Sequence, residues 1–61
     1  MNRITIEIKT GNESFSPDPG YEIARILETL AKRFKDGGSF SGALQDYNGN
    51  TVGTVRVTDD R

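Results

Sequence analysis

The chain of 61 residues contains no cysteine and no histidine. Without cysteine it has no disulfide, no thiolate nucleophile and no thiolate metal ligand. Without histidine the commonest general base and the commonest metal ligand are also missing. A chain this short can hardly enclose a ligand pocket of roughly 300 Å³ or more. We therefore expect no enzymatic activity, no cofactor, no metal site and no small-molecule pocket.

The chain also lacks an excess of charge of either sign. Eight basic and nine acidic residues give a net charge of −1, whereas general nucleic-acid binders are usually strongly basic. No stretch is long and apolar enough to cross a membrane, and the first residues have no apolar signal-peptide core. These features predict a cytoplasmic protein. The carboxylates of Glu7 and Asp46 are expected to lie apart from one another in solvent.

A chain of this size forms one domain, here residues 1–61, near the lower limit for independent folding. With no disulfide to staple it, its net stability should be roughly a few kcal/mol. Dimerisation would add to this margin, so self-association is one of our expectations.

Strict alternation over residues 3–9 predicts the first strand, with Ile4, Ile6 and Ile8 on its buried face. Apolar residues at spacings of three and four then predict a helix over residues 19–36. Asp18 suits its N-cap and Pro19 its first position. The single aromatic of the preceding polar loop, Phe15, should close one end of the core.

A hairpin follows, with strands over residues 40–47 and 50–58. Asn48-Gly49 predicts a two-residue type I′ turn between them. In that register Leu44 lies opposite Gly53 and Gly42 opposite Val55. The inner face then carries Phe40, Leu44, Val55 and Val57. The outer face carries Ala43, Gln45, Tyr47, Val52, Thr54 and Arg56.

This order of elements predicts an α+β fold, a two-layer β-α-β-β domain with a three-stranded antiparallel sheet on one helix. We favour the strand order 1-3-2, because the last strand has the β-branched content of a central strand. The alternative order, 1-2-3, contains one parallel pair.

Three groups of residues also carry a resemblance: Ile4-Thr5-Ile6-Glu7-Ile8, Ile23-Ala24-Arg25-Ile26-Leu27 with Leu30, and Leu44-Gln45-Asp46 with Asn48-Gly49-Asn50-Thr51-Val52-Gly53. Together with the Phe15 loop they resemble short, mostly uncharacterised proteins encoded by bacteriophages and prophages. The resemblance covers most of the chain and implies a phage-related origin, which would place the protein in the host cytoplasm. It implies no activity and no site residues.

Two surfaces are candidates for binding. The first is the exposed sheet face, with Arg3, Lys9, Tyr47, Val52 and Arg56, which mixes cations with an aromatic and suits a protein partner. The second is the basic end of the helix, with Lys32, Arg33 and Lys35, where positive charge also complements the helix dipole. We expect a small non-enzymatic interaction module that binds a protein partner or itself. The alternative is a small nucleic-acid-binding protein that uses either basic patch.

Overall fold

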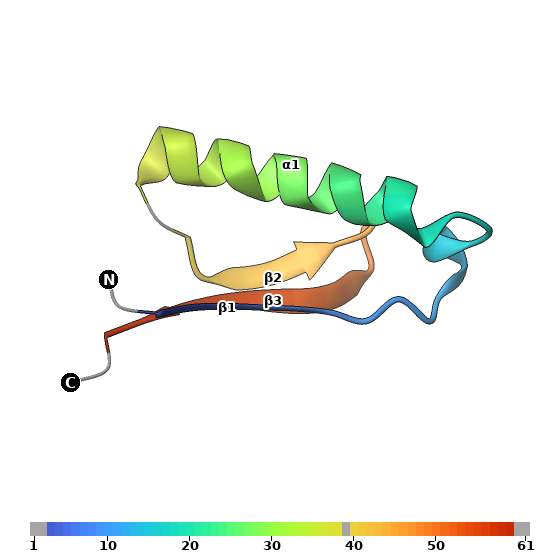
Figure 1. The fold of residues 1–61 in the computed structure, drawn as a ribbon, viewed down its shortest axis with the longest axis horizontal. Helices are drawn as coiled ribbons and strands as arrows, with labels where there is room; N and C mark the ends of the chain where they lie inside the picture. The colour runs from blue at the N-terminus through green and yellow to red at the C-terminus, as the bar shows by residue number, and fades with distance from the viewer. Residues whose placement is uncertain (1–2, 39, 60–61) are drawn as a thin grey trace.

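The computed structural model describes residues 3–38 and 40–59. Its elements are β1 (Arg3–Ile8), the 3-10 turn η1 (Glu13–Phe15), α1 (Pro19–Gly37), β2 (Gly42–Gln45) and β3 (Thr51–Thr58). The strands form one antiparallel sheet in the order β1-β3-β2, and α1 lies along one face of it (Figure 1). The predicted α+β fold and the predicted strand order are therefore confirmed.

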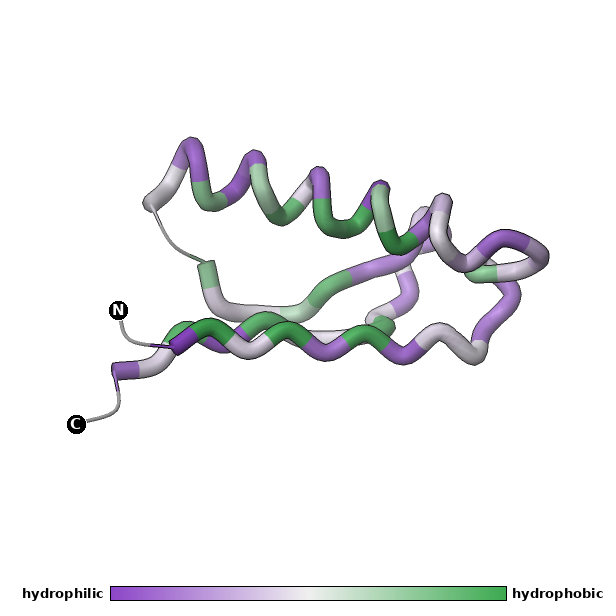
Figure 2. Tube along the Cα trace, in the orientation of Figure 1, coloured by the Kyte–Doolittle hydropathy of each residue, from purple (hydrophilic) through white to green (hydrophobic). Residues whose placement is uncertain are grey.

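The helix begins at the signals that its sequence carries. The Asp18 backbone is extended, and its carboxylate accepts a hydrogen bond from the Gly20 N–H at 3.1 Å. Pro19 is the first helical residue, where its missing N–H costs no helical hydrogen bond. The apolar stripe of α1 faces the sheet (Figure 2), and Ile26 and Leu30 are buried there. Within the described residues no helix combines the length and the apolarity that crossing a bilayer needs.

The core lies between α1 and the β2–β3 half of the sheet. Phe15, from η1, is 3 % exposed and belongs to this core, as predicted. The buried apolar residues are Phe15, Ile26, Leu30, Leu44, Val52 and Val55.

The β2–β3 loop differs from the predicted two-residue turn. The Asp46 N–H donates to the Asn50 carbonyl at 2.9 Å and the Gly49 N–H donates to the Asp46 carbonyl at 3.0 Å, so three residues lie between Asp46 and Asn50. Gly49 has a φ of +86°, the left-handed conformation that the last position of such a loop requires. Asp46 favours this longer loop because its carboxylate accepts the N–H groups of Asn48 and Asn50, both at 2.9 Å.

A β-bulge then restores the predicted register. Gln45 pairs with Thr51 but Leu44 pairs with Gly53, so Val52 is the extra residue of β3. A bulge re-aims the side chain at the extra position, and Val52 points into the core with 7 % exposure. The prediction that Val52 lies on the outer face is therefore wrong. Beyond the bulge, Leu44 lies opposite Gly53 and Gly42 opposite Val55, as predicted.

Candidate functional site

Two carboxylates are buried where η1, the first turns of α1 and the β2–β3 loop meet, at one end of the molecule (Figure 1). Glu22 is 2 % exposed and Asp46 is 4 % exposed. The expectation that Asp46 lies in solvent is therefore wrong. The only sequence signal that could have placed it is its position at the start of a turn, where aspartate often accepts backbone N–H groups.

Glu22 is held by a two-point ion pair with Arg25. Arg25 Nε donates to Glu22 Oε1 and Arg25 Nη2 donates to Glu22 Oε2, both at 2.9 Å. The Tyr47 N–H donates to the same Oε2 at 2.9 Å. The hydrogen bonds from Arg25 lower the pKa of Glu22, against the opposing effect of burial, and the bond from Tyr47 lowers it further. The hydrogen bond from the Tyr47 N–H to Glu22 joins α1 to the β2–β3 loop.

Asp46 connects that loop to η1. Its Oδ2 accepts a hydrogen bond from Asn12 Nδ2 at 3.0 Å, and Asn12 also caps η1 by accepting from the Ser14 N–H at 2.8 Å. Burial raises the pKa of Asp46, but hydrogen bonds from Asn50, Asn12, Ser14 and Asn48 outweigh it and lower the pKa to about 2.

We call Glu22, Arg25 and Asp46 the polar clamp. In the described part of the chain, no buried side-chain nitrogen or oxygen is left without a hydrogen-bond partner. The described residues also contain no group of three or more side chains that could hold a metal ion. Because the carboxylates of the clamp are held by their donors, its role is to join three segments of chain.

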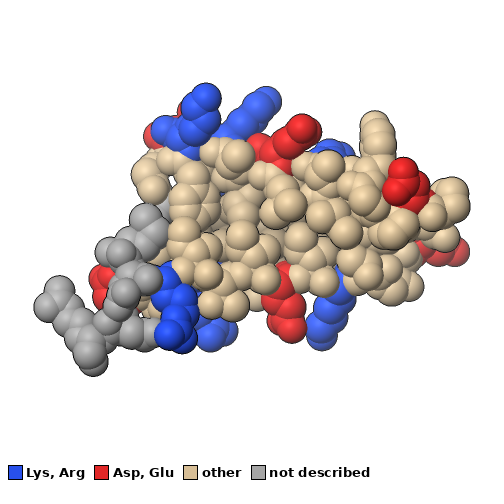
Figure 3. Space-filling model, in the orientation of Figure 1, with Lys and Arg blue, Asp and Glu red and all other residues tan. Residues whose placement is uncertain are grey.

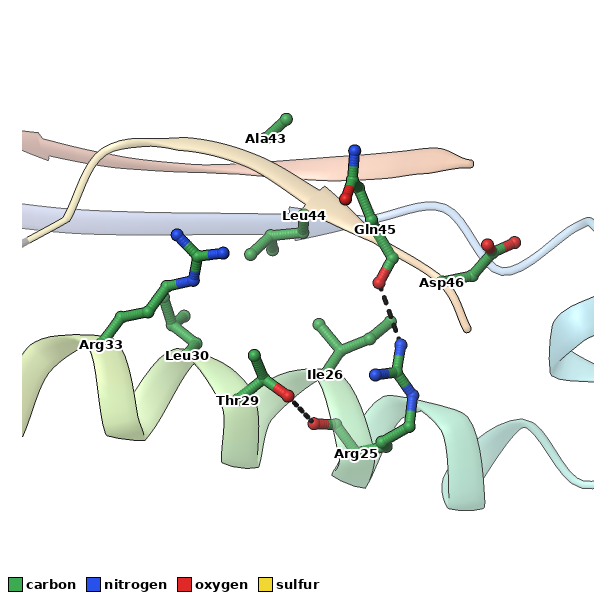
Figure 4. Close-up of a pocket in the computed structure, with 9 residues that line it drawn as sticks. All are labelled: Arg25, Ile26, Thr29, Leu30, Arg33, Ala43, Leu44, Gln45 and Asp46. Atoms are coloured by element: carbon green, nitrogen blue, oxygen red, sulfur yellow. Dashed lines mark hydrogen bonds between the residues drawn. The ribbon is translucent and has the colours of Figure 1, made fainter. Parts of the chain in front are cut away.

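A groove of about 150 Å³ lies between α1 and β2, with Arg25 and Arg33 on its helical side (Figure 4). Its volume is below the roughly 300–1,000 Å³ of typical ligand pockets. Arg25 Nη2 crosses the groove and donates to the Gln45 carbonyl at 3.0 Å, while the Arg33 guanidinium lies 4.5 Å from the centre of the Phe40 ring. The helix therefore covers the outer edge of β2.

The predicted binding face is only partly assembled. Thr5 pairs with Arg56 and Arg3 pairs with Thr58, so Arg3 and Arg56 lie close together on the outer face. Lys9 follows β1 and is exposed. Val52 lies in the core, as described above.

Tyr47 does not lie on the outer face either. It is part of the β2–β3 loop and is 62 % exposed. With Tyr21 and Pro17 it lines a hollow of about 280 Å³ beside the beginning of α1. The three-residue loop is the reason, because it removes Tyr47 from the strand pairing that a two-residue turn would have imposed.

The predicted basic end of the helix lies in the last turns of α1, where Lys32, Arg33 and Lys35 are all exposed. Arg33 stacks on Phe40. Lys32 and Arg33 share an open hollow with Asp36, so an acidic group lies within the same patch. The carboxylate of Asp36 therefore weakens the positive charge of this patch.

A surface that the sequence analysis did not single out lies along β1. Ile4, Ile6 and Leu27 are 43 %, 44 % and 41 % exposed although the pattern assigns all three to buried positions. The helix packs over β2 and β3, with Arg25 and Thr29 on its β2 flank. Leu27 lies on the opposite flank, because successive helical residues are rotated by about 100°.

We call Ile4, Ile6 and Leu27 the β1 edge strip. In the view of Figure 3, which has β1 in front of β3, the surface between the charged side chains of the helix and those of the sheet is uncharged. The open edge of β1 borders this strip, since β1 is an outer strand of the sheet. Backbone groups and apolar side chains are thus exposed side by side.

Comparison with protein-family models, curated protein sequences and solved structures finds no match to this chain. What the protein does must therefore be inferred from its own surfaces.

Proposed function

We propose that this protein is a small non-enzymatic interaction module, which binds a protein partner or a second copy of itself through the β1 edge strip. The observation that carries the proposal is the contrast between the two edges of the sheet. The resemblance of its strand and hairpin segments to phage-encoded proteins supports a phage origin. Its lack of cysteine accords with a cytoplasmic location.

The edge of β2 is protected in ways that natural sheets commonly use. The strand has only four residues, and Arg25 caps its exposed Gln45 carbonyl. Short edge strands and covering helices both prevent unwanted pairing.

The edge of β1 has neither protection. The strand has six residues, no proline, and three isoleucines pointing to the face on which the helix lies. An edge strand that nothing covers and that exposes apolar side chains either causes aggregation or receives another strand. Ile4 and Ile6 supply the apolar contacts that would accompany such strand addition.

The nucleic-acid alternative has less support from the geometry. Arg3, Lys9 and Arg56 remain exposed, but Glu7 lies on the same face between Arg3 and Lys9. Without Tyr47, the described residues of this face include no aromatic ring, and base stacking on aromatic rings is a main source of affinity for single strands. Protein binding needs no such platform.

The test is selection of a random-peptide display library on the immobilised protein, followed by NMR mapping of the peptides that bind. We expect extended peptides with alternating apolar residues, and shift changes in β1 and at Leu27. Ile6→Glu should abolish binding, because it places a charge on the strip. Ala31→Glu is the matched control, which places the same charge at an exposed position of α1 outside the strip. Failure to select any peptide, or mapping to the outer face or the basic helix end, would refute the proposal.

A further inference from the structure

We propose that the occupant of the β1 edge is a second copy of this chain, paired antiparallel through β1 itself, with Arg3 opposite the partner's Glu7. This inference rests on the proposed function and names its partner. The joined sheet would have six strands, with the two β1 strands at its centre.

The hydrogen-bond pattern of the sheet determines which groups face the open edge. Lys9 N–H donates to the Val52 carbonyl at 2.8 Å, and the register pairs Ile8 with Gly53 just before it. Antiparallel strands alternate, so every second residue directs its N–H and C=O toward the neighbouring strand. Thr5 and Glu7 therefore bond to β3, whereas Ile4 and Ile6 direct their backbone groups to the open side.

Two β1 strands can therefore bond only through the backbone groups of their even-numbered residues. In such a pair, each even-numbered residue lies opposite an even-numbered residue of the partner. With Thr5 opposite the partner's Thr5, Ile4 lies opposite the partner's Ile6 and each pair exchanges two backbone hydrogen bonds. The same register places Arg3 opposite the partner's Glu7, and does so twice because the two-fold axis repeats the contact.

The neighbouring registers are electrostatically worse. A shift that places Ile4 opposite the partner's Ile4 sets Arg3 opposite the partner's Thr5, so the attraction between opposite charges is lost. A shift that places Ile6 opposite the partner's Ile6 sets Arg3 opposite the partner's Lys9. A further shift sets Glu7 opposite the partner's Glu7. Like charges directly opposite one another destabilise a strand pair, whereas opposite charges stabilise it. The charges of β1 thus favour the register in which Arg3 lies opposite the partner's Glu7.

The side-chain positions agree with this register. A two-fold axis perpendicular to the sheet leaves both helices on the same face. Ile4 and Ile6 are 43 % and 44 % exposed in the single chain, and each would acquire a partner isoleucine directly opposite, at the close distance of cross-strand neighbours. One contact therefore covers both the open edge of β1 and the two isoleucines beside it.

The test uses charge reversal and sedimentation equilibrium of the whole chain. Arg3→Glu alone and Glu7→Arg alone should each weaken self-association about tenfold, because each sets like charges opposite one another at two sites. An equimolar mixture of the two variants should regain dimers, since at both sites a carboxylate of one variant then meets a guanidinium of the other. Lys32→Glu, which makes the same change in net charge on the helix as Arg3→Glu, should leave the dimer unchanged. Circular dichroism confirms that each variant is folded.

Amide hydrogen exchange supplies the second readout. In dilute solution the Ile4 and Ile6 amides should exchange rapidly, and at high concentration they should become protected, whereas the Thr5 and Glu7 amides are protected throughout. A wild-type monomer at millimolar concentration, or a dimer that the mixture of variants does not restore, overturns the self-pairing. If a selected peptide still protects the Ile4 and Ile6 amides of that monomer, the proposed function stands and only its partner is different.

Discussion

Replacing Val52 is the sharpest test of the bulge. Val52→Ala removes two methyl groups from a side chain that is 7 % exposed. Transfer alone accounts for about 1.6 kcal/mol, at ~0.8 kcal/mol per methylene-sized group. The cavity left behind raises the expected loss to ~2–3 kcal/mol. A domain of 61 residues has a free energy of unfolding of roughly 3–9 kcal/mol, so this change removes a large part of it.

The assay is heat and urea unfolding followed by far-ultraviolet circular dichroism. For a domain of this size the loss corresponds to a fall in Tm of roughly 10–20 °C. Val52→Thr keeps the shape but buries a hydroxyl, and should cost ~1–3 kcal/mol. The reciprocal control is Thr54→Val on the exposed outer face of the same strand, which should stay within about 0.5 kcal/mol of the wild type.

The opposite pattern would refute the bulge. If Val52→Ala and Val52→Thr both change the free energy of unfolding by less than about 0.5 kcal/mol, Val52 faces solvent and the hairpin has the two-residue turn.

Three further predictions follow from the loop, the central strand and the outer face. The pKa of Asp46 falls from 3.8 to about 2 on folding, so the folded state binds fewer protons than the unfolded state. The contribution of Asp46 to stability is therefore complete above about pH 4 and is lost as the pH falls toward 2. Urea midpoints measured down to pH 2 should show this decline, and Asp46→Asn should flatten it. Gly53→Ala should destabilise by about 3 kcal/mol or more in the same urea assay, because its Cβ would lie 1.9 Å from the Glu7 carbonyl oxygen; an unchanged midpoint would show that β1 and β3 are further apart. Titration with random single-stranded DNA should give no salt-dependent binding at tens of micromolar, and binding that weakens with salt would favour the nucleic-acid alternative.

The fold was predictable because each element carries its own signal. The Asp18-Pro19 pair predicts where α1 begins, and the alternation of isoleucines predicts β1. The strand order followed from the β-branched content of β3, which suits a strand paired on both sides. These signals are local, and they agree with one another.

The hairpin loop was predicted less well because two effects compete there. Asn48-Gly49 favours a two-residue turn, but the Asp46 carboxylate favours a longer loop that satisfies two backbone N–H groups. The bulge at Val52 then compensates for the extra loop residue, so the pairing beyond it matches the prediction although the turn does not. This is why Tyr47 and Val52 lie away from the predicted face.

The β1 edge strip could not be predicted from periodicity. The pattern assigns Ile4, Ile6 and Leu27 to inner faces, and they do lie on those faces. What the pattern cannot give is the lateral position of a single helix over a three-stranded sheet. Here the hydrogen bond from Arg25 to the Gln45 carbonyl and the one from the Tyr47 N–H to Glu22 hold α1 toward β2 and the loop that follows it, and β1 is left partly uncovered.

The pairing of β1 with β3 has a consequence for how the chain folds. It joins Arg3 to Thr58, so nearly the whole chain must close into a loop before this pair of strands can form, whereas the β2–β3 hairpin needs only local closure. Non-local pairing of this kind slows folding, and β1 is expected to dock last, onto a hairpin and helix that are already assembled. Until it does, β3 offers an unpaired edge that accepts the β1 of another copy equally well. Refolding at high protein concentration is therefore expected to yield domain-swapped chains, in which β1 completes a neighbouring molecule instead of its own.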